Sequence, residues 1–227
     1  MAFPLTHLIV AHRIAIETDM ADPGDFLLGS IAPDAVHFRR SFEKASMAEI
    51  GQAKKTSHLC PVSDELWGRV TDNDGWLRSI FEFLEVRTPF RLGYAVHALT
   101  DLYNNKTLWD GFRKNHPVEA AKGYKSGYYD DMRHIDALLK AETGVTGPIC
   151  GILAKAAPQG ISGLVSSDEV GAIKESILQD CQSAPSLSPA AKKRSANFVS
   201  YDDMQAFISD AWEFCAKLVF QSLLRYP

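Results

Sequence analysis

Apolar residues recur at every third or fourth position over long stretches of this chain, which is the pattern of helices with one buried face. Leu5, Leu8 and Ile16 share one side of such a helix within residues 4–19. No alternating run of apolar and polar residues is longer than about five residues, so the sequence predicts an all-α fold. The spacing predicts further helices at residues 76–86, 117–140, 167–181 and 201–224, and one that begins at Thr88–Pro89.

The segments between these helices differ in composition. Residues 21–25 are a turn by composition, and residues 35–60 hold few apolar positions, which indicates a long loop with short helical pieces. Residues 141–166 are rich in Gly, Pro and Ser and are expected to be the least ordered stretch. We also expect a helix start at residues 63–67, a cap from Asp74 on the helix at 76–86, and a linker at 185–189.

Composition narrows the function classes. The chain has 227 residues and 46% hydrophobic content, enough to bury a sizeable core. A formal net charge of −4 gives no basic footprint, so nucleic acid is not an expected partner. The four cysteines are far apart and form no C-x-x-C pair, which suits a reducing compartment better than a disulfide frame or a thiolate zinc site.

The N-terminal residues and the length of the apolar runs indicate in which cellular compartment the protein is expected. The N-terminal residues lack the basic region of a signal peptide, and no apolar run approaches the roughly 18 residues of a membrane span. The sequence therefore predicts a cytoplasmic protein with no transmembrane segment.

His97 and Asp101 are two polar residues within an otherwise mostly apolar predicted helix. Because they are four positions apart, both side chains leave the same face of that helix. A buried carboxylate is costly unless a cation or a metal meets it. The pair therefore indicates either a metal site or a simple hydrogen-bonded pair.

Three earlier residues, His7, Asp34 and His58, also lie in or beside apolar settings. Imidazole nitrogens and carboxylate oxygens are the ligands that zinc takes when cysteine is absent. Each residue has an ordinary alternative as well: a core histidine, a cap of the next turn and a surface loop residue. His12 and His37 are weaker candidates for the same site.

These motifs follow one another in a recognisable order: a histidine at position 7, Gly-x-x-x-Pro-Asp at 29–34, Thr-Ser-His at 56–58 and His-x-x-x-Asp at 97–101. In series they resemble the zinc-dependent phospholipase C family (the phospholipase C/D-type domain), over roughly residues 3–140. The resemblance implies a single-domain multi-helix bundle that holds a metal cluster. We therefore expect one helical domain over residues 1–227, with its metal-site part in 1–140 and a C-terminal helical layer in 165–227.

Carried over by position, the resemblance implies that Asp34, His58, His97 and Asp101 bind one Zn²⁺ ion. Asp101 would bridge to a neighbouring metal that His7 also binds. The family's N-terminal amine ligand is in doubt here, because the chain keeps its initiating Met and shows no cleavable leader.

The family's remaining zinc uses two histidines and a glutamate, and this sequence departs from that pattern. Asp130, Asp131 and His134 are possible additional ligands, or they are a solvated helix face. We expect one or two metal ions, zinc or another divalent transition metal. Thr6, Thr100 and Tyr94 are candidates for holding the ligand imidazoles in the right tautomer.

The resemblance favours a metal-dependent hydrolase of phosphoesters, a phospholipase C-like phosphodiesterase. Its substrate would be a small phosphoester or a phospholipid head group, and Asp34 would be a catalytic residue that orients or deprotonates water. Two other hypotheses remain open. One is a non-catalytic helical module in which four protein ligands close a structural metal site. The other is an interaction protein without metal, in which the His and Asp residues only pair.

Overall fold

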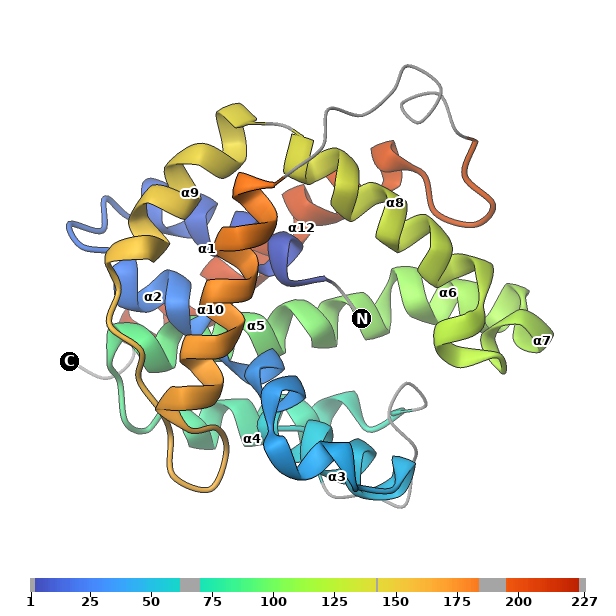
Figure 1. Ribbon diagram of the computed structural model, residues 1–227, viewed down its shortest axis with the longest axis horizontal. Helices are drawn as coiled ribbons and strands as arrows, with labels where there is room; N and C mark the ends of the chain where they lie inside the picture. Colours follow the sequence, from blue (N-terminus) through green and yellow to red (C-terminus); the bar gives the residue numbers. More distant parts are fainter. Residues whose placement is uncertain (1–2, 62–69, 142, 184–194, 225–227) are drawn as a thin grey trace.

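A computed structural model describes residues 3–61, 70–141, 143–183 and 195–224 (Figure 1). Within these ranges the chain forms eleven α-helices and three short 3-10 helices, and it contains no β-strand. The helices build one compact bundle, which confirms the all-α prediction. The expected helix start at 63–67 and linker at 185–189 lie outside the described residues.

The described elements are, in chain order, α1 (Pro4–Glu17), α2 (Gly24–Gly29), η1 (Ala32–Phe38), η2 (Arg40–Glu43), α3 (Met47–Ser57), α4 (Asn73–Phe83), α5 (Pro89–Lys106), α6 (Leu108–Asn115), α7 (Pro117–Ala120), η3 (Gly123–Lys125), α8 (Gly127–Ala141), α9 (Thr143–Lys155), α10 (Ser167–Gln182) and α12 (Tyr201–Leu224).

The predicted helices at the start, centre and end of the chain are confirmed as α1, α5, α10 and α12. Local signals explain where they begin. Thr88 caps α5 by accepting a hydrogen bond from the backbone N–H of Arg91, and Pro89 occupies the first turn. Ser166 and Glu169 form a capping box at the start of α10.

Four predictions about the connecting segments were wrong in part or in full. Residues 35–60 contain a regular helix, α3, which starts from a capping box of Ser46 and Glu49. Asp72, not Asp74, caps α4 by accepting from the N–H of Gly75. The helix expected over 117–140 is broken into α7, η3 and α8 around Gly123, whose φ of +56° is left-handed. The Gly/Pro-rich stretch contains α9, with Pro148 inside it.

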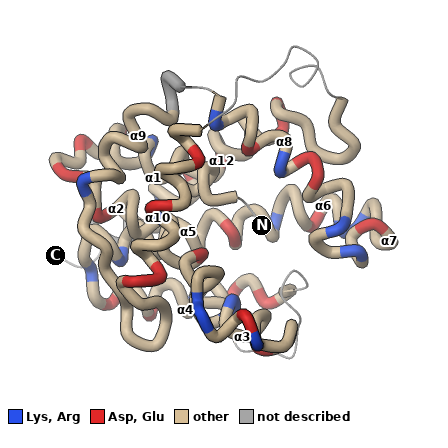
Figure 2. Tube along the Cα trace, in the orientation of Figure 1, with Lys and Arg blue, Asp and Glu red and all other residues tan. Residues whose placement is uncertain are grey.

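Helix α5 is the central element of the bundle. In Figure 1 it lies between α3 and α4 on one side and α8 and α9 on the other, and α1, α2, α4 and α12 all contact it. Basic and acidic residues are interspersed over the helices in the view of Figure 2. None of the described helices is long and apolar enough to cross a bilayer.

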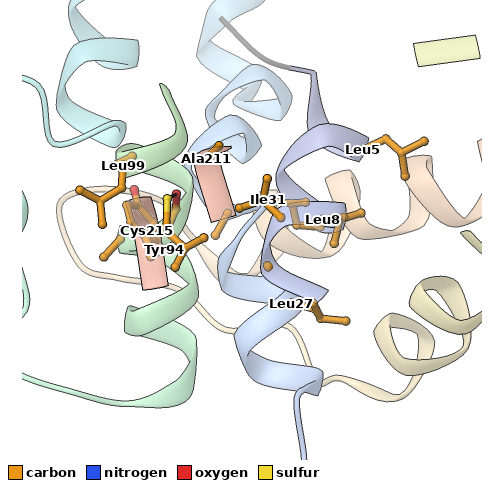
Figure 3. Close-up of a cluster of buried hydrophobic side chains, with 14 of the residues drawn as sticks. Leu5, Leu8, Leu27, Ile31, Tyr94, Leu99, Ala211 and Cys215 are labelled. Atoms are coloured by element: carbon orange, nitrogen blue, oxygen red, sulfur yellow. Dashed lines mark hydrogen bonds between the residues drawn. The ribbon is translucent and has the colours of Figure 1, made fainter. Parts of the chain in front are cut away.

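The core joins the N-terminal helices to the last one. Figure 3 shows Leu5 and Leu8 of α1 in one cluster with Tyr94 of α5 and Ala211 and Cys215 of α12. These five side chains are buried. Because burying an apolar side chain contributes about 1.5–3 kcal/mol, the closing helix stabilises the elements that carry the candidate site.

Candidate metal centre

Five side chains from four elements converge inside the bundle. His7 comes from α1, Asp34 from η1, His58 from the C-terminal cap of α3, and His97 and Asp101 from α5. All but Asp34 are at most 1% exposed, and Asp34 is 16% exposed. The five residues that the sequence singled out as the main metal ligands therefore lie together.

The carboxylate of Asp101 lies among three imidazoles. Its Oδ1 is 3.6 Å from Nε2 of His7, and its Oδ2 is 3.6 Å from Nε2 of His58 and 3.7 Å from Nε2 of His97. Oδ1 of Asp34 lies 3.3 Å from Nε2 of His58. Every one of these histidines thus turns Nε2, rather than Nδ1, toward a carboxylate.

Backbone carbonyls fix the tautomers of two of the rings. Nδ1 of His97 is 2.7 Å from the carbonyl oxygen of Ser30, and Nδ1 of His58 is 2.9 Å from that of Lys54. Since a carbonyl can only accept, Nδ1 must be the donor in both rings. A neutral ring with its proton on Nδ1 has a lone pair on Nε2, which is the form that binds a metal.

Burial favours the neutral form of two of these histidines. It lowers the pKa of His7 well below its ordinary value, and the neighbouring His97 lowers it further. Burial also lowers the pKa of His97, although Asp34 and Asp101 oppose that shift. The rings of His7 and His97 are stacked, with centroids 3.6 Å apart and planes 10° apart, an arrangement that two imidazolium cations would oppose by repulsion.

The Asp34 carboxyl is held in its charged form. Burial alone would raise its pKa, but the close approach of the His58 imidazole, and of those of His97 and His7, outweighs that effect and lowers the pKa far below its usual range. Asp34 therefore contributes negative charge to the cluster at neutral pH.

Two histidines of the cluster keep ring nitrogens that lack a hydrogen-bond partner in the described part of the chain. Both ring nitrogens of His7 and Nε2 of His97 are buried and have no hydrogen-bond partner in the described structure. Buried polar atoms left in this state are costly. A divalent cation among the lone pairs and carboxylate oxygens would remove that cost.

Two overlapping groups have ligand atoms within 4.8 Å of one another: His7, Asp34 and His97, and His58, His97 and Asp101. Imidazole and carboxylate ligands at such spacing are those of zinc and related transition metals. These buried groups can therefore form a metal site.

The three possible additional ligands on α8 belong to neither group. Asp130 is exposed and forms an ion pair with Arg133. Asp131 accepts hydrogen bonds from the backbone N–H groups of residues 197, 198 and 199, at 2.7–3.2 Å. His134 lies on the same helix, half-buried. The structure does not bring these side chains into the five-residue cluster.

Of the weaker candidates, His37 lies near the cluster, with Nε2 3.8 Å from Oδ1 of Asp34. The hydroxyls of Thr6 and Thr100 do not hold the imidazoles: they donate to Met204 Sδ and to the Val96 carbonyl. The phenol of Tyr94 does not contact an imidazole of the cluster through its hydrogen bond: it donates to the backbone carbonyl of Ser57, the residue before His58.

Sequence reasoning missed the carbonyls of Ser30 and Lys54 as the groups that orient the rings. For Lys54 a signal existed, because it lies four residues before His58, one turn earlier in a helix.

The cluster borders a cavity of about 400 Å³. Asp34, His58 and Asp101 reach its wall, and the remaining lining comes from the N-terminal residues and from η1, α3, η3, α8 and α10. The lining includes both apolar side chains, such as Ile173, and charged ones, such as Lys140. A metal held by this cluster would therefore face a space large enough for a small molecule.

Comparisons of this chain with protein-family models, curated proteins and solved structures found no match.

Proposed function

We propose that this protein is a metal-dependent hydrolase of phosphoesters, related to the zinc-dependent phospholipase C family that its motif order resembles. The observation that carries the proposal is the position of the His/Asp cluster at the wall of a cavity, where Asp34, His58 and Asp101 all contribute to the lining. Catalytic zinc sites keep a position open to substrate, whereas structural ones are closed by protein ligands.

The ligand roles follow the family pattern, although the closest ligand atoms divide the residues differently: His7 lies with Asp34 and His97, and His58 with His97 and Asp101. Asp34, His58, His97 and Asp101 would hold one ion, and His7 would share Asp101 with a second. When bound, zinc supplies Lewis acidity, which brings the pKa of water toward neutrality and offsets negative charge on a phosphoryl oxygen.

Asp34 is the proposed catalytic residue. It is more exposed than Asp101, it borders the cavity, and its lowered pKa keeps it ionised. Its carboxylate would accept a hydrogen bond from the attacking water and so aim the water oxygen at phosphorus. As the new P–O bond forms and the ester P–O bond breaks, the carboxylate takes the proton of the water, and solvent protonates the leaving oxygen.

The size of the cavity bears on the substrate. About 400 Å³ lies near the lower end of the range for small-molecule pockets. A small phosphoester, or the head group of a phospholipid, fits this space. Apolar side chains such as Leu5 and Ile177 line part of it and would keep water away from the reacting group.

A structural metal site is the second candidate, and the burial of His58, His97 and Asp101 to 1% or less favours it. With Asp34 these residues would supply four ligands and close the coordination of one ion. In that case the cavity would play no part in chemistry, and the metal would only stabilise the fold.

Metal analysis followed by a substrate screen separates the two. We expect purified protein to contain zinc or a related metal, and to hydrolyse phosphomonoesters or phosphodiesters in a metal-dependent way. Asp34→Asn should reduce the rate by about 100-fold or more, within the usual range for losing a general base. His116→Ala is the control, because His116 is exposed and outside the cluster.

Stoichiometric metal with no turnover of any phosphoester would support the structural alternative, and metal-free protein would refute both.

A further inference from the structure

Lys54 is a buried cation in the wall of the same cavity as the His/Asp cluster. Its side chain is only 7% exposed, and it lines the cavity together with Asp34, His58 and Asp101. Its position is fixed from two sides. Its carbonyl oxygen accepts the hydrogen bond from Nδ1 of His58, and its Nζ donates to the hydroxyl oxygen of Tyr124 at 2.8 Å.

The charge of Lys54 is not matched by a neighbouring carboxylate. No described Asp or Glu has an oxygen within 4.0 Å of its Nζ. Burying an ammonium group without a counter-charge is costly. Asp34 and Asp101 in the cluster would not offset this cost in the metal-loaded protein, because the metal itself neutralises them.

Lys140, the other lysine of the cavity, is in the opposite situation. Its Nζ is 3.0 Å from a carboxylate oxygen of Asp136 and 2.9 Å from one of Asp180. Two acidic groups therefore surround one ammonium there. Of the two lysines, only Lys54 has a charge that is left for an anionic ligand.

Tyr124 adds a donor beside this charge. The phenol oxygen accepts from Lys54, so its own O–H remains to donate to a third group. Tyr124 is 50% exposed and also lines the cavity, and Nζ of Lys54 lies 4.9 Å from its ring centroid. The two residues come from α3 and η3, so the pair joins two walls of the cavity.

We propose that Lys54 and Tyr124 form an anion subsite, which binds the phosphoryl oxygens that the metal cluster does not hold and selects phosphomonoesters as substrates. The selection of phosphomonoesters rests on the proposed function, whereas the binding of an anion by Lys54 and Tyr124 does not. A terminal phosphate carries close to two negative charges and three non-bridging oxygens, enough to reach both the metal cluster and an ammonium. A diester has one charge and two such oxygens, so it would lose the contact with Lys54 or gain less from it.

Calorimetric titration of the zinc-loaded protein with inorganic phosphate tests the subsite directly. Lys54→Met keeps most of the length and the apolar character of the side-chain stem, and it should weaken phosphate binding by about 10- to 100-fold, as expected for losing a hydrogen bond to a charged group. Tyr124→Phe should weaken it less. Lys125→Met is the matched control, because it removes an equal charge from an exposed position next to Tyr124 and should leave the Kd unchanged.

The zinc content of each variant is measured in the same samples. Lys54→Met with unchanged zinc and unchanged phosphate affinity would overturn the subsite, even if the protein proves to be a hydrolase. Phosphate binding that depends on Lys54 in a protein without metal would support the subsite and refute the proposed function. In the screen, a rate for monoesters no higher than that for diesters or for lipid vesicles would overturn the selectivity.

Acetylation of the unmodified protein gives a second measurement that does not depend on any variant folding. Phosphate should slow the modification of Lys54, measured by mass spectrometry, and leave that of Lys125 unchanged. If phosphate leaves the modification of Lys54 unchanged as well, the subsite is wrong.

Discussion

Gly29 of α2 and Gly93 of α5 lie at a contact between the two helices that leaves no room for a side chain at either position. A Cβ on Gly29 would overlap the carbonyl of Phe90, and one on Gly93 would overlap the carbonyl of Phe26. The arrangement is reciprocal: each glycine lets the backbone of the other helix approach. The two helices therefore pack backbone to backbone at this point.

This approach has a consequence for the metal cluster. Ser30 directly follows Gly29, and its carbonyl oxygen accepts the hydrogen bond from Nδ1 of His97, one turn along α5 from Gly93. If the helices moved apart, that bond of 2.7 Å would lengthen and the tautomer of His97 would no longer be fixed. The helix contact thus presents Nε2 of His97 to the carboxylates.

Gly93→Ala should destabilise the protein by about 1–3 kcal/mol or more, because backbone atoms rather than a flexible side chain must shift. Urea unfolding measures the free energy, and the zinc content should fall in the same variant. Gly111→Ala is the control: its Cβ would meet nothing within 4 Å, so alanine there should raise stability by about 0.5–1 kcal/mol. Equal stability of Gly93→Ala and wild type would show that α2 and α5 can separate without cost.

The central helix and its pair of polar residues could be predicted because the signals are local. Pro89 and the apolar spacing define the start of α5, and a separation of four places His97 and Asp101 on one face. His7 and Asp34 could not be placed beside them by physical reasoning from the sequence, since nothing local says which helices meet. Only the order of motifs in a family resemblance suggested that grouping.

Physical reasons explain why the sequence pattern did not reveal helix α3 or the contact that orients His97. The buried residues of helix α3 are Lys54, Lys55 and Ser57, none of them apolar, so a search for apolar spacing misses the helix. Its capping box, Ser46 and Glu49, was the available signal. The hydrogen bond from His97 to Ser30 involves a backbone carbonyl, which every residue has, so no side-chain pattern can reveal it.

Asp101→Asn should abolish stoichiometric zinc binding. Its carboxylate lies 3.6–3.7 Å from three imidazole nitrogens, so it contributes charge where all the ligand atoms meet. An amide keeps the shape but loses the negative charge that a divalent cation requires. Asp130→Asn is the control, since that exposed residue should leave the zinc content unchanged. Elemental analysis of the purified variants measures both, and full zinc occupancy in Asp101→Asn would contradict the proposed ligand set.

Asp131→Ala should lower the free energy of unfolding by about 2–4 kcal/mol without changing the zinc content. Its buried carboxylate accepts from the N–H groups of Asn197, Phe198 and Val199, the residues that lead into α12. Removing a charged acceptor leaves such donors without a partner. Chemical unfolding and elemental analysis test the two parts separately. A loss of zinc with unchanged stability would instead make Asp131 a ligand, as one sequence hypothesis had it.

The metal-free protein should lose stability as the pH falls below about 6.5. Burial lowers the folded-state pKa of His7 and of His97 below the ordinary value of 6.5. Between the two values the unfolded chain binds protons that the folded chain does not, so acid favours unfolding by about 1.4 kcal/mol per pH unit for each ring. Well above pH 6.5 both rings are neutral in the folded and in the unfolded chain, so the free energy of unfolding has its full value there.

Urea unfolding of chelator-treated protein from pH 7.5 to 5.5 measures how the free energy of unfolding changes with pH. His7→Gln should reduce that slope by the contribution of one imidazole. A flat profile would show that these imidazoles are not buried in the neutral form.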